Sequence, residues 1–230
     1  MMPGKVWFSL LGPVEIRVDD TTVAMPSRVR TLLSILLCRA NQTVGVDELT
    51  DVLWNDEPPR AGAGTLRSHV LRLRRLLGDA GDRVETSSCG YRIELDPQTE
   101  LDTTVFAQRH EAARAAARAG GWSTVSSTAY AALELWRGAP LADVPSDRLQ
   151  RDEVPRWLQA RVEATELAAR ADLRLGRATE AVLLLQRLAA EQPYQEGVHA
   201  LLMEALAAAG RRVEAIAVYR RLRTVLSNEL

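Results

Sequence analysis

The chain contains only two cysteines, Cys38 and Cys89, among its 230 residues. Two cysteines far apart in sequence, without the spacing of metal ligands, indicate neither a disulfide nor a metal site. Cys38 stands in the apolar run at 32–38, so we expect it to be a small core residue. The three histidines, at positions 69, 110 and 199, also lack partners at ligand spacing. We therefore expect no metal and no cofactor.

Patterns for membrane entry and for catalysis are missing as well. The sequence has no signal-peptide pattern and no long uninterrupted apolar run. It has no Ser/His/Asp order and no G-x-S-x-G, and the glycine-rich stretch 61–65 lacks the lysine of a nucleotide-binding loop. Hydrophobic residues, at 47%, suffice for real cores. These features predict a soluble, cytoplasmic protein that is not an enzyme and does not contact a membrane.

The chain also lacks an excess of basic charge. Its 29 Lys and Arg residues are balanced by 30 Asp and Glu, and the formal net charge is −1. Within residues 1–95 the basic and acidic side chains are equal in number. Any binding to nucleic acid must therefore come from a local patch.

Residues 60–77, RAGAGTLRSHVLRLRRLL, form such a patch, because they include five arginines and no carboxylate. At about 100° per residue, Leu66, Val70, Leu73 and Leu77 fall within one narrow arc, which predicts an amphipathic helix with a buried stripe. The positions beside and opposite this stripe, with Arg60 ahead of them, are polar except for one leucine: Thr65, Arg67, Ser68, His69, Leu71, Arg72, Arg74 and Arg75. Such a face suits a DNA groove. A solvated basic face is the alternative.

The segments around the basic helix follow the order of a winged helix-turn-helix. Before it we expect strands at 5–11, 14–18 and 22–25, a buried helix from Ser27 as N-cap to residue 40, and a helix at 48–54 capped by Asp47. After it, Gly78 is a suitable C′ residue. Strands at 83–88 and 90–95 then form a hairpin, and Arg92 lies just past its tip. A hairpin directly after a recognition helix is a wing.

The second half reads as helices at 103–119, 122–137, 148–175, 177–191, 195–209 and 212–228. Gly176 and Gly210 stand 34 residues apart, as do Glu180 and Glu214. A 34-residue period with a small residue at the turn is typical of tetratricopeptide repeats. An ordinary helical bundle is the alternative. The fold class is therefore mainly α with a small β component, a winged helix followed by an all-α tetratricopeptide-like domain.

Several runs together resemble the Streptomyces antibiotic regulatory protein family. They are LLGPVEIRV at 10–18, the run at 27–59, TLRSHVLRLRRLLGDAG at 65–81, CGYRIELDP at 89–97 and LELWRGAPLADVP at 133–145. The resemblance implies an OmpR/PhoB-type winged-helix domain at 1–96 and a bacterial transcriptional activator domain at 97–230.

The resemblance also implies roles for particular residues. Arg72 matches a base-contacting arginine, and His69 and Arg74 match phosphate-contacting positions. Cys89 replaces a frequent threonine at the wing tip, and Leu71 replaces a frequent arginine. The implied protein is a transcriptional activator of a secondary-metabolite cluster, associated with the nucleoid. It binds direct repeats in double-stranded promoter DNA as two or more copies, or as a homodimer, and contacts RNA polymerase.

An acidic group at Asp47, Glu48, Asp51 and Glu57 lies next to the basic helix in sequence. Because carboxylates cannot favour DNA, we expect this group to meet a basic surface of a sigma factor or the polymerase. Acids that simply favour a helix N-terminus are the alternative. A rival function for the whole chain is a tetratricopeptide scaffold or sensor whose winged helix mediates protein contacts.

Overall fold

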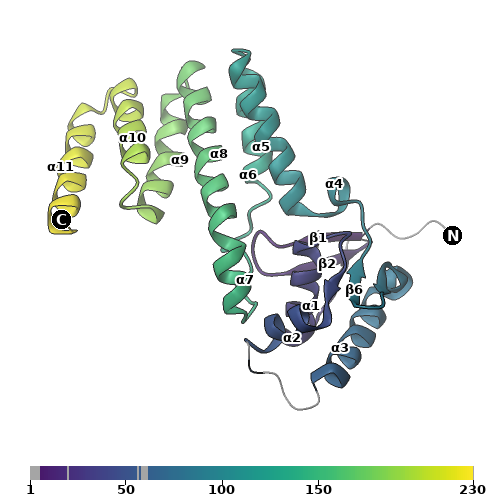
Figure 1. Cartoon of the computed structure of the whole chain (residues 1–230). Coiled ribbons are helices and arrows are strands. Elements are labelled where there is room, and N and C mark those ends of the chain that lie inside the picture. Colours follow the sequence, from purple (N-terminus) through teal and green to yellow (C-terminus); the bar gives the residue numbers. More distant parts are fainter. Residues whose placement is uncertain (1–5, 20, 56, 58–61, 230) are drawn as a thin grey trace. The chain divides into compact units, whose positions relative to one another are not determined.

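The computed structural model describes residues 6–19, 21–55, 57 and 62–229. The chain forms two compact units (Figure 1). The first comprises Met1–Phe106 together with Leu135–Leu158, and the second comprises Ala107–Glu134 together with Gln159–Leu230. The sequence boundary after residue 96 divides the chain differently and stays a prediction.

The first unit opens with an antiparallel sheet in the order β1-β2-β3. Its strands are Val6–Ser9, Glu15–Val18 and Thr21–Thr22. Phe8 pairs with Ile16, and both side chains are fully buried, so this register turns the apolar side chains to the core. The third strand is shorter than expected and starts one residue earlier.

Three helices follow, α1 (Ser27–Cys38), α2 (Val46–Trp54) and α3 (Gly62–Leu77). The two predicted N-caps are wrong. Ser27 and Asp47 lie inside the first turns of α1 and α2, and neither helix start has a side-chain cap. Pro26 and Gly45 take the cap positions in extended backbone instead.

A second antiparallel sheet, in the order β4-β6-β5, completes the winged helix. Its strands are Val44–Gly45, Gly90–Ile93 and Val84–Thr86. The short helix η1 (Gly78–Arg83) joins α3 to β5, and Gly78 at φ 55° ends α3 as predicted. A Cβ atom at Gly90 would lie 1.8 Å from the carbonyl oxygen of Val44, so the wing requires glycine there.

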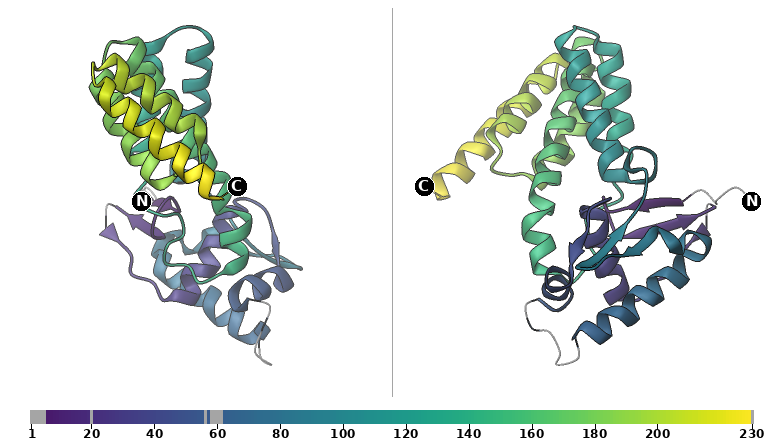
Figure 2. Two further views of the ribbon diagram at one scale, coloured as in Figure 1. Left: turned by 90° about the vertical axis from the view of Figure 1, so that its left-hand side faces the viewer. Right: turned by 45° about the vertical axis from the view of Figure 1, so that its right-hand side comes forward.

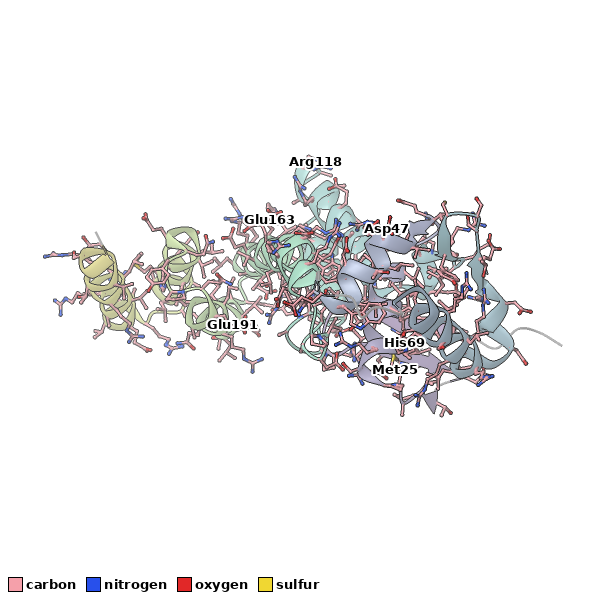
Figure 3. All side chains as sticks on the ribbon, turned by 60° about the horizontal axis from the view of Figure 1, so that its bottom comes forward. Met25, Asp47, His69, Arg118, Glu163 and Glu191 are labelled. Atoms are coloured by element: carbon pink, nitrogen blue, oxygen red, sulfur yellow. The ribbon has the colours of Figure 1, made fainter. Side chains whose placement is uncertain are left out.

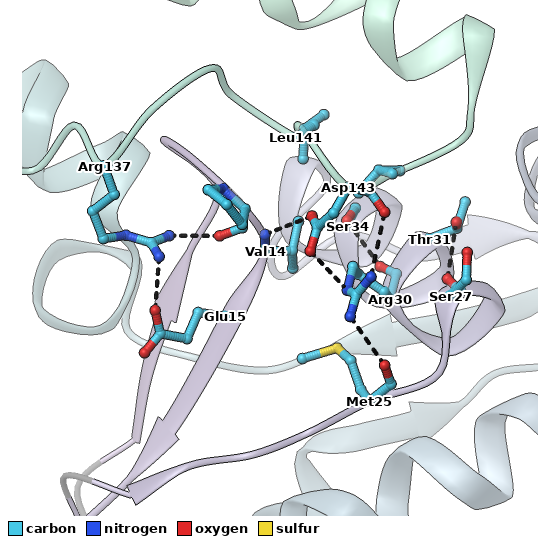
Figure 4. Close-up of polar contacts among 12 residues, drawn as sticks. Val14, Glu15, Met25, Ser27, Arg30, Thr31, Ser34, Arg137, Leu141 and Asp143 are labelled. Carbon is cyan, nitrogen blue, oxygen red and sulfur yellow. Dashed lines mark hydrogen bonds and ion pairs between the residues drawn. The ribbon is translucent and has the colours of Figure 1, made fainter.

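Residues 135–158, the return segment, pack back onto the winged helix (Figure 4). The Arg137 guanidinium donates to Glu15 and to the carbonyl of Pro13, both at 2.7 Å. The Asp143 carboxylate accepts from the amide of Val14 at 2.8 Å and pairs with Arg30 at 3.1 Å. Periodicity did not predict this arrangement, since each bond joins residues more than 100 positions apart.

Asp102, which follows the short helix α4 (Pro97–Glu100), makes a second set of long-range bonds within this unit. Its buried carboxylate accepts from the amides of Leu10 and Leu11 at 2.9 Å. Burial raises the pKa of this carboxyl to about 6, while the two backbone bonds act in the opposite direction.

The predicted helix at 148–175 is in fact two helices, α7 (Asp147–Asp152) and α8 (Val154–Arg174). Pro155 lacks an amide hydrogen and suits the first turn of α8, which begins anew after Glu153. The buried Glu153 pairs with Arg39 at 2.7 Å and with Arg156. The helix expected at 122–137 is also shorter than predicted, since α6 ends at Leu133.

The second unit is all helical. It consists of α5 (Asp102–Arg118) from residue 107 on, α6 (Trp122–Leu133), α8 from residue 159 on, α9 (Ala178–Glu191), α10 (Glu196–Ala208) and α11 (Arg212–Glu229). The last three lie side by side (Figure 2). Gly176 lies between α8 and α9, and Gly210 lies between α10 and α11. Both adopt the same left-handed backbone, with φ of 75° and 76°. The buried Asp172 accepts from Tyr130 at 2.6 Å and from Ser126 at 3.2 Å, which joins α6 to α8.

Candidate nucleic-acid interface

The basic helix α3 has the two faces that its sequence predicts. The side chains of Leu66, Val70, Leu73 and Leu77 are at most 1% exposed, so the leucine stripe is core. Arg67, Ser68, Leu71, Arg72 and Arg75 are exposed, and Thr65, His69 and Arg74 are half-buried. Leu71 is 52% exposed and lies among these polar side chains. The outer surface of α3 therefore contains donors and one large apolar side chain, without a carboxylate.

Three of these arginines are available to an outside ligand. In the part of the chain that the structure describes, Arg67, Arg72 and Arg75 form no ion pair. Guanidinium groups in this state can bind phosphate or take both acceptors of a guanine edge. Arg60 lies outside the described residues.

Arg74 is held inside the unit. Its Nε donates to the carbonyl of Val84 at 2.8 Å, and Nη2 donates to Thr86 Oγ1 at 2.9 Å. Both partners belong to β5, so Arg74 ties α3 to the wing. A Cβ atom on Gly81 would lie 2.4 Å from the Arg74 carbonyl oxygen, which shows how closely η1 passes α3. The expected phosphate contact of Arg74 stays a prediction.

Arg92 also has an internal partner. Its Nη2 and Nε lie 2.7 Å and 3.1 Å from Glu85 Oε2, across the β5–β6 pair. Arg92 is half-buried, while Cys89 at the wing tip is exposed. The hairpin register supplies this cross-strand pairing with Glu85, which the position of Arg92 just past the wing tip did not predict.

His69 lies on α3 beside α2, as labelled in Figure 3. Its ring centroid is 6.2 Å from that of Trp54. Burial lowers the pKa of His69, and the positive charges of Arg28 and Arg72 lower it further. The lowered pKa favours the neutral imidazole at physiological pH. Arg28, an exposed α1 residue that donates to the Leu53 carbonyl, is an additional cation near α3 that no periodic pattern identified.

Among the described residues, the acidic group divides into carboxylates with an ion-pair partner and carboxylates without one. Glu48 lies 4.0 Å from Arg39 and 3.9 Å from Arg148, and Asp51 lies 3.8 Å from Arg148. Arg148 comes from α7 in the return segment, about 100 residues away in sequence, so no local pattern could predict this pairing. Asp47, labelled in Figure 3, and Glu57 are exposed.

Other kinds of site find no support in residues 6–19, 21–55, 57 and 62–229. Over these ranges no three His, Cys, Asp or Glu side chains are grouped to hold a metal ion. None of the helices described there is long and apolar enough to cross a membrane. Cys38 is half-buried at the end of α1, and desolvation raises the pKa of its thiol to about 12, which makes it unreactive.

A winged helix followed by helical repeats defines a two-domain class of bacterial transcriptional regulators. Residues 20–93 match the family model "Transcriptional regulatory protein, C terminal", and residues 101–230 match "Bacterial transcriptional activator domain".

Several named regulators are similar to the chain over nearly all its length. EmbR of Mycobacterium tuberculosis is 33% identical over 97% of the chain, AfsR of Streptomyces coelicolor 37% over 99%, and DnrI of Streptomyces peucetius 33% over 96%. The chain spans 58% of EmbR, 23% of AfsR and 85% of DnrI. A solved structure of M. tuberculosis EmbR, in complex with a low affinity phosphopeptide, matches 99% of the chain and 61% of its own length. The TM-score is 0.91 at 31% identity.

The chain belongs to the Streptomyces antibiotic regulatory protein family. The resemblance of its motifs to this family and the predicted fold class are thereby confirmed. The relatives are named as regulatory proteins, which agrees with the expectation that the chain is not an enzyme.

Proposed function

We propose that this chain is a sequence-specific DNA-binding transcriptional activator. The single observation that supports this is the exposed, acid-free surface of α3, where Arg67, Arg72 and Arg75 have no ion-pair partner among the described residues. An α-helix with this surface fits the major groove, and the wing beside it reaches the flanking backbone. Thr65, Ser68, His69 and Leu71 complete the contact surface, with Arg60 ahead of them.

The substitution Arg72→Ala tests this proposal. It removes a guanidinium that would donate two parallel hydrogen bonds to a base edge. We therefore expect a loss of about 1–3 kcal/mol in binding free energy on the specific site and little change on scrambled DNA. Fluorescence anisotropy titrations on both DNAs, at several salt concentrations, measure the difference. Equal losses on the two DNAs would remove Arg72 from base reading, and absence of binding to any promoter fragment of the gene neighbourhood would refute DNA binding.

We infer further that the operator consists of direct repeats near a promoter of a secondary-metabolite cluster. The support is the family membership, with DnrI and AfsR among the relatives. One helix and one wing make few base contacts, so two copies side by side provide the needed affinity. DNase protection on the neighbouring promoters gives the operator and the copy number together.

We propose that the acidic group contacts a basic surface of RNA polymerase or its sigma factor. Asp47 and Glu57 are exposed and carry this proposal, whereas Glu48 and Asp51 are partly neutralised by Arg148. The double variant Asp47→Lys with Glu57→Lys should reduce transcription in vitro while promoter binding remains. Unchanged transcription with unchanged DNA binding would rule the contact out.

A further inference from the structure

Helices α9 and α11 occupy equivalent positions in successive repeats, yet one face differs between them in exposure. Positions 182, 185 and 189 of α9 are Val, Leu and Ala, with exposures of 0%, 0% and 9%, and they belong to one core with the buried residues of α10. Thirty-four residues later stand Ile216, Tyr219 and Arg223, all exposed. Ile216 and Tyr219 are 52% and 53% exposed.

The other side of α11 is already packed. Ala215 and Val218 are partly buried against the core that α9 and α10 share. At about 100° per residue, six of the exposed positions lie within a separate arc of about 120°, whereas Glu214, Ala217, Arg221 and Thr224 are also exposed but lie outside it. We call this arc the α11 outer face, and its members are Arg212, Val213, Ile216, Tyr219, Arg220 and Arg223. In the preceding repeat the middle of the equivalent face, at positions 182, 185 and 189, is buried in the core shared with α10, whereas positions 179 and 186 at its edge are exposed. A helix is therefore the shape that fits the middle of this face.

The charge of the α11 outer face indicates what kind of helix it fits. Equivalent positions in α9 are Ala178, Thr179, Val182, Leu185, Gln186 and Ala189, which carry no charge. Arginine replaces Ala178, Gln186 and Ala189, and no acidic residue lies on the arc. Among the described residues none of these three arginines forms an ion pair. A second copy using the same face would set arginine against arginine, which disfavours a two-fold dimer.

We propose that the α11 outer face binds one amphipathic helix of a partner protein, apolar along one stripe and acidic along its flanks. The apolar stripe covers Val213, Ile216 and Tyr219, which are exposed by 82%, 52% and 53%. The carboxylates on its flanks pair with Arg220 and Arg223. Such a helix reproduces the cover that α10 gives to α9 and adds charge pairing that sets its orientation. This surface is independent of DNA binding by α3.

The test uses the full chain and two fluorescent synthetic peptides based on residues 195–209. One carries glutamate, and the matched peptide lysine, at four of the exposed α10 positions, 200, 204, 207 and 208. We expect saturable binding of the glutamate peptide, about tenfold tighter than that of the lysine peptide. The double variant Ile216→Asp with Tyr219→Asp should abolish it. Arg220→Glu with Arg223→Glu should reverse the preference between the peptides.

Leu183→Asp is the matched control, because Leu183 is an equally exposed apolar residue, 57%, outside the α11 outer face. All substituted side chains are exposed, and circular dichroism checks that the helices remain. Equal binding of the two peptides, no binding of either, or an equal loss in the Leu183→Asp variant overturns the proposal. If light scattering detects a dimer that Ile216→Asp dissociates, the occupant is a second copy and the proposal is likewise overturned.

Discussion

The guanidinium groups of Arg74 and Arg92 are bound inside the first unit, whereas those of Arg67, Arg72 and Arg75 form no ion pair among the described residues. Arg74 donates to the backbone and side chain of β5, and Arg92 pairs with Glu85 across the wing. A DNA phosphate must compete with these partners. For Arg92 the competitor is a half-exposed carboxylate, and such surface pairs are weak, so exchange for a phosphate costs little.

We predict that Glu85→Gln strengthens DNA binding. The change releases Arg92 and removes one negative charge from the wing, so affinity should rise severalfold on specific and scrambled DNA alike, with a steeper salt dependence. Anisotropy titrations measure both effects. Glu94→Gln removes the same charge from an exposed position next to β6 without freeing an arginine. An equal gain in that control would show that only net charge matters.

Arg74→Ala should loosen the wing. Loss of the bonds to Val84 and Thr86 leaves the β5 carbonyl dependent on water, so hydrogen exchange of the β5–β6 amides should accelerate about tenfold. DNA binding should weaken on every sequence. Arg75→Ala is the comparison, because Arg75 is an exposed neighbour that forms no ion pair in the described residues. Wing protection that is unchanged in Arg74→Ala would disprove this link.

At the scale of elements, the sequence predicts the features that depend on residues close together in the chain. The leucine stripe of α3, the apolar α1 and the wing hairpin were all predicted, because each depends on residues within a few turns or one hairpin. The docking of the return segment was not predicted. Its bonds from Arg137 and Asp143 to residues 13–15 need the whole fold to bring them together. The pairing of Arg148 with the acidic group was not predicted for the same reason, because the partners lie far apart in sequence.

Asp102 predicts a pH dependence for the junction of β1 and α5. Its pKa is about 6 in the folded chain, against an ordinary 3.8, because burial disfavours the charge. Its contribution to stability is therefore fully present below about pH 4 and is lost as the pH rises from there through 6, by about 3 kcal/mol at most. Asp102→Asn, which is neutral throughout, should lack this component.

Urea unfolding of the two proteins between pH 4 and 7 measures the difference. The free energy of unfolding of the wild type should fall relative to that of Asp102→Asn as the pH rises, because only the wild type gains a buried charge. The gap between the two proteins should therefore change across this range. Asp79→Asn, an exposed carboxyl on η1, controls for general charge effects. A constant gap from pH 4 to 7 would contradict the assignment.

At the scale of the whole molecule, the near-neutral charge limits how the chain can bind DNA. With a net charge of −1, no long-range positive field gathers it on DNA, so under the proposed function we expect its affinity to depend on a few groups on α3 and the wing. Arg67, Arg72 and Arg75 are open, and Arg74 and Arg92 become available only by leaving their partners. From this count we predict a weak single-site interaction and a strong dependence on copy number.

We therefore predict the salt dependence of binding to one repeat and to two. Arg72 is assigned to a base edge, so if Arg67 and Arg75 reach phosphates, the slope of log affinity against log salt is about −2, and release of Arg74 and Arg92 brings it to about −4. On DNA with two direct repeats the slope should be twice that of one repeat. Inverted repeats of equal spacing are the control, since side-by-side copies in the same orientation cannot use them. A slope far steeper than about −4 on one repeat would mean that arginines of the second unit also reach DNA.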